Sequence, residues 1–333
     1  MLEPLGGVLA DRLEHPEAIA VADAEQALVD QRLKVVDIGV ADDLGGVERA
    51  APVEDGQARH TVEYPTALDS TEALLAGIEA AVREVAVVVG RPDAIGIGVP
   101  SQIEFATGTV VASVNIPLAG VPLREELGGR FGVPVYVDND ASCAGLAEAN
   151  AIGATDLVML TLGTGVGGGI VAGGRIFRGA DGLGGELGHI VVEADGPECP
   201  GTCPNHGCLE ALCSGTALER AAGRKGRDVV EAARAGDAEA QGHLDRLGRY
   251  LGIGISNMVN AFQPKVIVIG GGLSAAADLF LDTAVAEAGT RALPSLWERA
   301  TVQVAKAGNA AGVIGAGLLA LQEQARAGDT PTT

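Results

Sequence analysis

One histidine and three cysteines lie close together in the sequence and could bind a metal ion. His189 is followed by Cys199, Cys203 and Cys208, with proline and glycine between the first two cysteines. One nitrogen and three sulfur ligands suit tetrahedral zinc, and a site with all four positions filled is structural. The alternative is a set of free or buried thiols, but proline and glycine in this cysteine knuckle (residues 199–208) are typical of a loop. The sequence therefore predicts a structural Zn²⁺ site at these four residues.

Two carboxylates flank the cysteine knuckle. Glu186 lies three residues before His189, and Glu210 lies two residues after Cys208. A bound metal would fix both ends of the loop and would thereby hold these side chains relative to each other. Carboxylates held in this way can accept hydrogen bonds from the hydroxyl groups of a sugar. Considered singly, each could equally be an ordinary surface glutamate.

Two glycine-rich segments each follow a predicted strand. Residues 162–169 read Leu-Gly-Thr-Gly-Val-Gly-Gly-Gly and lie between apolar stretches, which predicts a hairpin. Backbone N–H groups in such a segment can converge on an anion, and Thr164 adds a hydroxyl group. The segment lacks the lysine of a P-loop, and a turn without a ligand is the alternative. Residues 270–272 are three further glycines after an apolar stretch, although Ser274 could simply cap a helix there. Together the two segments favour a nucleotide.

Asp140 lies where a predicted strand ends and a predicted helix begins, in the segment Val-Asp-Asn-Asp-Ala at residues 137–141. An aspartate at this place could cap the helix. It could also accept the proton of a hydroxyl group that attacks a phosphoryl group. Taken alone, the position leaves both roles open.

The remaining pattern predicts alternating strands and helices from residue 61 onward. Apolar runs predict strands at 62–64, 94–99, 133–137, 157–162, 169–172 and 266–269, and helical spacing predicts helices at 70–89, 139–150, 238–262 and 311–325. In residues 238–262, leucines 244, 247 and 251 recur at helical spacing, and Pro264 ends the pattern. Such alternation predicts α/β layers. Residues 1–60 show a helix-like stretch at 16–29 but no comparable strand pair.

Length and charge limit the function classes. A chain of 333 residues predicts two domains. The net charge of −21, from 44 acidic and 23 basic residues, opposes binding to nucleic acid or to an anionic membrane. The sequence shows no secretory signal and no apolar run long enough to span a bilayer. Five cysteines, three of them clustered, suit metal binding better than disulfides, so a reducing cytoplasm is expected.

In order, these segments resemble the ROK family (repressor, open reading frame, kinase) of sugar kinases and repressors. The resemblance covers residues 94–317 and includes segments 95–100, 115–117, 137–140, 162–169, 185–189, 207–210 and 266–274. It implies a two-lobed α/β fold of the actin-like ATPase type, with a sugar bound between the lobes. We expect residues 61–113 and 310–326 in the smaller lobe, residues 114–309 with the knuckle in the larger lobe, and an atypical N-terminal segment at 1–60.

The resemblance also implies roles for single residues in ATP-dependent phosphorylation of a hexose, with glucose favoured. Asp140 would be the base on the sugar hydroxyl. The sugar would be held by Asn115, Asn139, Asp140, Glu186, His189 and Glu210. ATP would be bound by Gly163, Thr164, Gly165, Gly167 and Gly168 at its phosphates and by Gly270, Gly271 and Gly272 at the adenosine, with Mg²⁺. A cytoplasmic homodimer with no nucleic-acid or membrane partner is expected.

The chain departs from the family pattern in three places. Three residues separate Cys199 from Cys203, where one is usual, and Ser101 replaces a frequent glycine. The family also opens with an Asp-x-Gly-Gly-Thr phosphate hairpin. Its nearest counterpart is Asp-Ile-Gly at residues 37–39, followed by Val-Ala-Asp-Asp at 40–43, where two added carboxylates would repel phosphate. We therefore expect a chain that binds sugar normally and turns over ATP weakly.

Two other functions compete with the kinase. A sugar-responsive repressor of the same family would carry a basic DNA-binding segment at its N-terminus, but residues 1–60 hold 13 acidic and 5 basic residues. A sugar-binding protein with impaired kinase activity would result if the altered phosphate hairpin were inactive. Sugar-phosphate formation in a coupled assay separates both from an active kinase.

Overall fold

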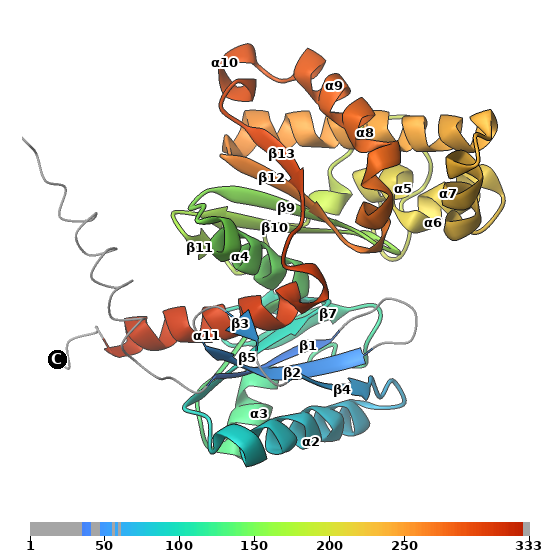
Figure 1. Cartoon of the computed structure of the whole chain (residues 1–333). Coiled ribbons are helices and arrows are strands. Elements are labelled where there is room, and N and C mark those ends of the chain that lie inside the picture. Colours follow the sequence, from blue (N-terminus) through green and yellow to red (C-terminus); the bar gives the residue numbers. More distant parts are fainter. Residues whose placement is uncertain (1–34, 41–46, 55–56, 59–60, 329–333) are drawn as a thin grey trace, which may run out of the picture.

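The computed structural model describes residues 35–40, 47–54, 57–58 and 61–328. These residues form two main sheets stacked with helices between them (Figure 1). Helices α4 (Asp140–Ile152) and α11 (Ala311–Gly328) lie between the sheets and pack against each other. Each sheet has its own hydrophobic core of Leu, Ile, Val and Ala side chains. The chain therefore consists of two α/β halves joined by a helical layer.

One half is a six-stranded sheet in which β5 is buried along its whole length. β5 runs parallel to β1 on one side and to β8 on the other. Helices α2 (Thr71–Val89) and α3 (Leu123–Phe131) cover one face, and α11 covers the other (Figure 1). The strands are β1 (Val35–Val40), β2 (Val47–Glu54), β3 (Gln57–Ala58), β4 (Val62–Pro65), β5 (Ala94–Val99) and β8 (Val135–Asn139). A short hairpin, β6 (Ser101–Glu104) with β7 (Thr109–Ser113), follows β5.

Two expectations about this half differ from the structure. β1 and β2 form an antiparallel pair inside the sheet, whereas no strand pair stood out in the sequence of residues 1–60. The short sequence of β1 carries little signal, and its place is fixed by pairing with the distant β5. β8 also pairs with β5, so a strand of this sheet lies within residues 114–309, which were expected in the larger lobe. The helix-like stretch 16–29 lies outside the described residues.

The other half is a five-stranded sheet of order β11-β10-β9-β12-β13. Its strands are β9 (Leu157–Leu162), β10 (Val166–Ala172), β11 (Arg175–Ile176), β12 (Val266–Gly270) and β13 (Thr301–Val304). The predicted hairpin is formed by β9 and β10. Because β10 begins at Val166, three residues earlier than expected, the turn is only residues 163–165, and Gly167 and Gly168 lie in the strand.

Helices pack on this second sheet and on the loops that follow it. They are η1 (Leu187–His189), α5 (Leu209–Cys213), α6 (Gly215–Ala222), α7 (Gly226–Arg234), α8 (Ala238–Phe262), η2 (Gly272–Leu279), α9 (Leu281–Arg291) and α10 (Pro294–Trp297). The short helix η3 (Gly308–Ala310) instead leads into α11 and contacts it. The bounds of α8 are those predicted, and Leu244, Leu247 and Leu251 are buried. Within the described part of the chain, no helix combines the length and apolarity needed to cross a membrane.

Candidate active site

A small cavity lies between the two halves of the molecule. It is lined by Ser101, Gln102, Ile103, Asn139, Ser142, Gly167, Gly168, Gly182, Leu183, Gly184, Gly185 and Glu186. Two predicted sugar ligands, Asn139 and Glu186, are therefore brought together from segments far apart in the sequence. The other predicted ligands do not line it. Sequence reasoning missed its wall at residues 182–184, whose only signal was two glycines.

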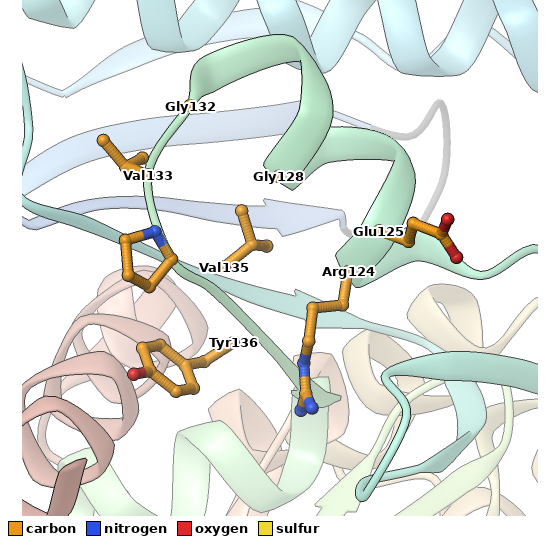
Figure 2. A pocket seen from close by; sticks show the side chains of 8 residues that line it. Arg124, Glu125, Gly128, Gly132, Val133, Val135 and Tyr136 are labelled. Atoms are coloured by element: carbon orange, nitrogen blue, oxygen red, sulfur yellow. The ribbon is translucent and has the colours of Figure 1, made fainter. Parts of the chain in front are cut away.

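A larger cavity of about 560 Å³ lies elsewhere, between α3 and β8 (Figure 2). Arg124 from α3 and Tyr136 from β8 are among the side chains that line it. None of the residues predicted for sugar, nucleotide or metal binding contributes to this cavity. The two Nη atoms of Arg124 already donate to the backbone oxygens of Phe105 and Ala106. The size of this cavity alone does not make it the reactive centre.

The start of α4 places Asp140 beside the small cavity. Asn139, and not Asp140, is the cap of this helix: its side chain accepts a hydrogen bond of 3.1 Å from the backbone N–H of Ser142. The Nδ2 atom of Asn139 also donates to the backbone oxygen of Ser101, 3.4 Å away. Asp140 is the first helical residue, half-buried, and its Oδ1 accepts from the N–H of Ala141 at 2.8 Å. The capping alternative for Asp140 is therefore wrong.

Asn115 lies on the exposed segment after β7, which is connected to the cavity through two serine hydroxyls. The hydroxyl of Ser113 donates to the backbone oxygen of Ile116 at 2.8 Å and accepts from the Ser101 hydroxyl at 2.9 Å. Ser101, which replaces the glycine frequent in the family, is buried and lines the cavity. The substitution thus supplies a hydroxyl that anchors the turn bearing Asn115.

The four predicted metal ligands lie together, with their ligand atoms within 4.8 Å of one another. Cys199 Sγ is 3.4 Å from His189 Nδ1, and Cys203 Sγ is 3.9 Å from Cys208 Sγ. A tetrahedral zinc ion, with bonds of about 2.3 Å to sulfur and about 2.0 Å to nitrogen, holds its ligands about 3.4–3.8 Å apart. Burial raises the pKa of the Cys199 and Cys208 thiols, whose protons a bound metal would displace. The geometry fits such an ion, and the longer cysteine spacing does not prevent it.

His189 connects the knuckle to the cavity. Its Nδ1 atom faces Cys199, and its Nε2 atom is 4.0 Å from Glu186 Oε2. Glu186 in turn lines the cavity. One imidazole ring therefore presents one nitrogen to the thiol cluster and the other to the carboxylate predicted to bind sugar.

Glu210 connects the knuckle to the glycine turn. It lies in the first turn of α5, and its Oε2 accepts a hydrogen bond of 2.8 Å from the backbone N–H of Val166, the first residue of β10. A Cβ atom at Gly165 would overlap this same carboxylate oxygen. Glu210 was predicted to contact sugar, and the structure shows in addition that it braces the turn between β9 and β10.

The two predicted glycine segments lie side by side. The turn 163–165 is held by α6, because Gly215 N–H donates to the oxygen of Gly163 and the Thr216 hydroxyl donates to that of Thr164, both at 2.8 Å. Gly271, at the end of β12, has a φ of 80°, and a Cβ atom there would lie 2.5 Å from the backbone oxygen of Leu162. Only glycine permits this approach. Gly167 and Gly168 instead line the small cavity.

One buried ion pair near Asp140 was not predicted. Asp138 is 3% exposed, and its Oδ2 accepts a hydrogen bond of 2.6 Å from Arg178 Nε. Burial raises the pKa of the Asp138 carboxyl, and the neighbouring Arg178 charge opposes that rise. The two residues are 40 positions apart in the sequence, so no local pattern joins them.

Comparison with known proteins identifies the family of this site. The model of the ROK family matches residues 36–323, and the chain belongs to this family. A curated glucokinase of Halalkalibacterium halodurans is 40% identical over 253 residues, which are 69% of this chain and 76% of that protein. The resemblance seen in the sequence motifs is therefore confirmed.

Solved structures agree on the fold. The ROK hexokinase from Thermus thermophilus is 34% identical, with a TM-score of 0.77 over 87% of this chain and 99% of its own. A ROK family glucokinase from Streptomyces griseus, solved in complex with glucose and AMPPNP, is 32% identical, with a TM-score of 0.72 over 86% and 98%. The two stacked halves are thus the lobes of the actin-like ATPase fold of sugar kinases.

Proposed function

We propose that this protein transfers the γ-phosphoryl group of ATP to a hexose, with glucose as the favoured substrate. The observation that carries the proposal is the position of Asp140. It lies in the sequence between Asn139 and Ser142, which line the small cavity, while Gly167 and Gly168, which also line it, lead back to the glycine turn. A carboxylate beside a polar cavity and next to a phosphate-type turn is the arrangement that phosphoryl transfer needs. The glucokinase relatives support the choice of sugar.

The chemical step follows from this arrangement. The hydroxyl oxygen of the sugar attacks the γ-phosphorus, its proton passes to the Asp140 carboxylate, and the bond to the bridging oxygen breaks to release ADP. One oxygen of Asp140 is already oriented by the N–H of Ala141, which limits rotation of the carboxylate. The remaining sugar hydroxyls are proposed to be held by Asn115, Asn139, Glu186, His189 and Glu210.

The nucleotide is proposed to bind at the paired glycine segments. Backbone N–H groups of Gly163, Thr164 and Gly165 would face its phosphates, and Gly270, Gly271 and Gly272 would lie against the adenosine. Mg²⁺ bound with ATP would spread the charge that develops on the phosphoryl oxygens. The contact between Gly271 and Leu162 supports a single nucleotide spanning both segments.

We propose that the metal at the cysteine knuckle is structural zinc, held by His189, Cys199, Cys203 and Cys208. With four protein ligands, such an ion supplies rigidity and no activated water. Its neighbours are the residues through which it would act: Glu186 beside His189, and Glu210 two residues after Cys208. Fixing the knuckle would therefore fix both the sugar side and the turn side of the site.

A homodimer in the cytoplasm, with neither nucleic acid nor membrane as partner, completes the proposal. The exclusion of nucleic acid and of an anionic membrane is supported by the net charge of −21, and the excess of acidic residues in residues 1–60 disfavours a DNA-binding repressor.

The test is a coupled assay for glucose 6-phosphate with ATP, Mg²⁺ and a panel of hexoses. Asp140→Asn should lower kcat by at least about 10²-fold, because the amide cannot accept the proton, while calorimetry shows glucose binding largely retained. Asp282→Asn, at an exposed aspartate in the first turn of α9, is the control and should be unchanged. Near-normal turnover of Asp140→Asn would remove its role as base, and no phosphorylation of any hexose would overturn the kinase.

A further inference from the structure

Arg178 makes contacts with three separate parts of the six-stranded half, although it follows β11 of the five-stranded sheet. Its Nε donates to Asp138 at the end of β8, and its Nη2 lies 3.8 Å from Glu323 Oε1 on α11. Its guanidinium carbon lies 3.6 Å from the centre of the Phe105 ring, in the turn between β6 and β7. The side chain is only 15% exposed. A guanidinium can bind and stack in this way because it is planar and has several donors.

The contact with Asp138 lies close to the proposed base, because Asp138 precedes Asp140 by two residues. Asp138 Oδ2 accepts from Arg178, and Asp138 Oδ1 accepts from the backbone N–H of Asn139 at 2.9 Å. Both oxygens of this buried carboxylate therefore accept hydrogen bonds. One bond comes from Arg178 of the five-stranded half, and the other comes from Asn139, which caps α4. Asp140 follows directly. The orientation of the strand end that carries the base thus depends on where Arg178 holds Asp138.

Arg178 directly precedes a segment that we call the cavity loop (residues 179–185). Four residues of this loop line the cavity. The backbone oxygen of Arg178 accepts a hydrogen bond of 2.8 Å from Gly184 N–H, which closes the loop on itself. The loop also packs directly on the β6–β7 hairpin, because a Cβ atom at Gly182 would lie 2.5 Å from the backbone nitrogen of Phe105. Glu186, proposed to bind sugar, follows the loop.

The turn that Arg178 stacks on is itself held firmly within the six-stranded half. Arg124 on α3 donates to the backbone oxygens of Phe105 and Ala106, at 2.6 and 2.8 Å, and lies 5.4 Å from the same ring. Arg124 therefore restrains both the backbone and the ring of Phe105. Because the ring is restrained, stacking on it restrains Arg178 as well.

We propose that Arg178 is a positioning residue that locks the cavity loop to the strand end bearing Asp140, and so sets the distance between the sugar and its base. The inference rests on the proposed kinase function. It concerns the sugar side alone, because the contacts described for Arg178 do not include the glycine segments proposed for ATP. A change in this lock should therefore alter sugar parameters and leave nucleotide parameters in place.

The experiment compares steady-state constants of the full-length protein with Arg178→Lys, Phe105→Leu and the exposed control Arg227→Met, whose side chain is 83% exposed. Lysine keeps the charge beside Asp138 but loses the planar fork and the stacking, so the variant should still fold, with a somewhat lower melting temperature. We expect its kcat to fall about 10- to 100-fold, since displacement of the base by about 1 Å has effects of this size. The KM for glucose should rise, and the KM for ATP should stay within about twofold of the wild type.

Phe105→Leu should shift the same two parameters in the same direction by a smaller factor, because it removes the ring without adding or removing a charge. Arg227→Met should leave all constants unchanged. Unchanged glucose parameters in both site variants, or equal shifts in the KM values for glucose and ATP, would overturn the inference. A wild-type protein that phosphorylates no hexose would instead overturn the proposed function, so the two failures are distinguishable.

Discussion

The two hairpins that open the two sheets differ in their turns far more than in their strands. β9 and β10 pair antiparallel next to β12, and β1 and β2 pair antiparallel next to β5. The first of these hairpins turns through Gly-Thr-Gly at residues 163–165. The sequence that joins β1 to β2 is Ala-Asp-Asp-Leu-Gly-Gly at 41–46, which lies outside the described residues. Strand pairing is therefore retained in both halves, and the residues suited to phosphate are present in only one.

The comparison separates what a sheet requires from what a ligand requires. Strand positions are fixed by backbone pairing with a buried neighbour, which tolerates many side chains. A phosphate turn needs specific N–H donors and little negative charge, so one substitution can abolish it without harming the sheet. The intact β1–β2 pair is accordingly no support for phosphate binding by the six-stranded half. In the five-stranded half, the hairpin also has the glycine turn that phosphate binding needs.

The largest effect is expected from damage to the intact turn. Gly165→Ala should lower kcat/KM for ATP by about 10²-fold, because its methyl group would push the Glu210 carboxylate off Val166 N–H and disturb the turn. The end of a glutamate side chain can move, so the melting temperature should change little. Steady-state kinetics and thermal unfolding measure both. Gly129→Ala, in open space on α3, is the matched control. ATP parameters equal to those of the control would mean that this turn does not bind the phosphates.

The next largest effect is expected from loss of the metal proposed for the cysteine knuckle. Cys203→Ser should lose bound zinc, about one ion per chain in the wild type, and raise the KM for glucose about 30-fold. The reason is that a bound metal would fix both ends of the knuckle and thereby restrain Glu186 and Glu210. Metal content by atomic emission and glucose binding by calorimetry check the two parts. Cys213→Ser, at a buried thiol outside the cluster, controls for loss of a cysteine. A metal-free protein with normal glucose affinity would contradict the prediction.

The smallest effect is expected from repair of the altered turn. Val40→Gly with Ala41→Thr would restore the family pattern Asp-x-Gly-Gly-Thr at residues 37–41 and should raise turnover about tenfold by better placement of the γ-phosphate. Because β1 and β2 already pair, only these two positions need to change. Val40→Ala alone should have no effect. If the wild type already turns over as fast as the double variant, its own turn binds phosphate in another way.

The features that could be predicted from sequence are those whose signal is local. The 25 residues of α8 carry a continuous apolar stripe and a following proline, so its bounds were correct. The knuckle was found because its four ligands lie within one short segment. The hairpin of β9 and β10 was recognised from apolar runs on either side of a glycine turn, although β10 starts earlier because Val166 pairs with Leu162.

The features that were missed depend on distant partners. β1 is a strand because β5 lies beside it, and β8 joins the same sheet for the same reason. Arg178 gained its role only when folding brought it to Asp138 and Glu323. The hydrogen bond between Glu210 and Val166 joins residues 44 positions apart. From the sequence alone, Glu210 could not be distinguished from an ordinary surface glutamate. Tertiary contacts, and not residue propensity, decided each of these cases.

Helix α11 has a consequence for how the protein is made. This last helix covers the face of the six-stranded sheet opposite α2 and packs against β1, β5 and α4 (Figure 1). Strands synthesised before α11 therefore remain open on one side until α11 itself has left the ribosome. The five-stranded half does not wait in this way, because its strands and covering helices all precede residue 305. We expect the nascent chain to complete its later half before its earlier half, against the usual order in which N-terminal domains fold first.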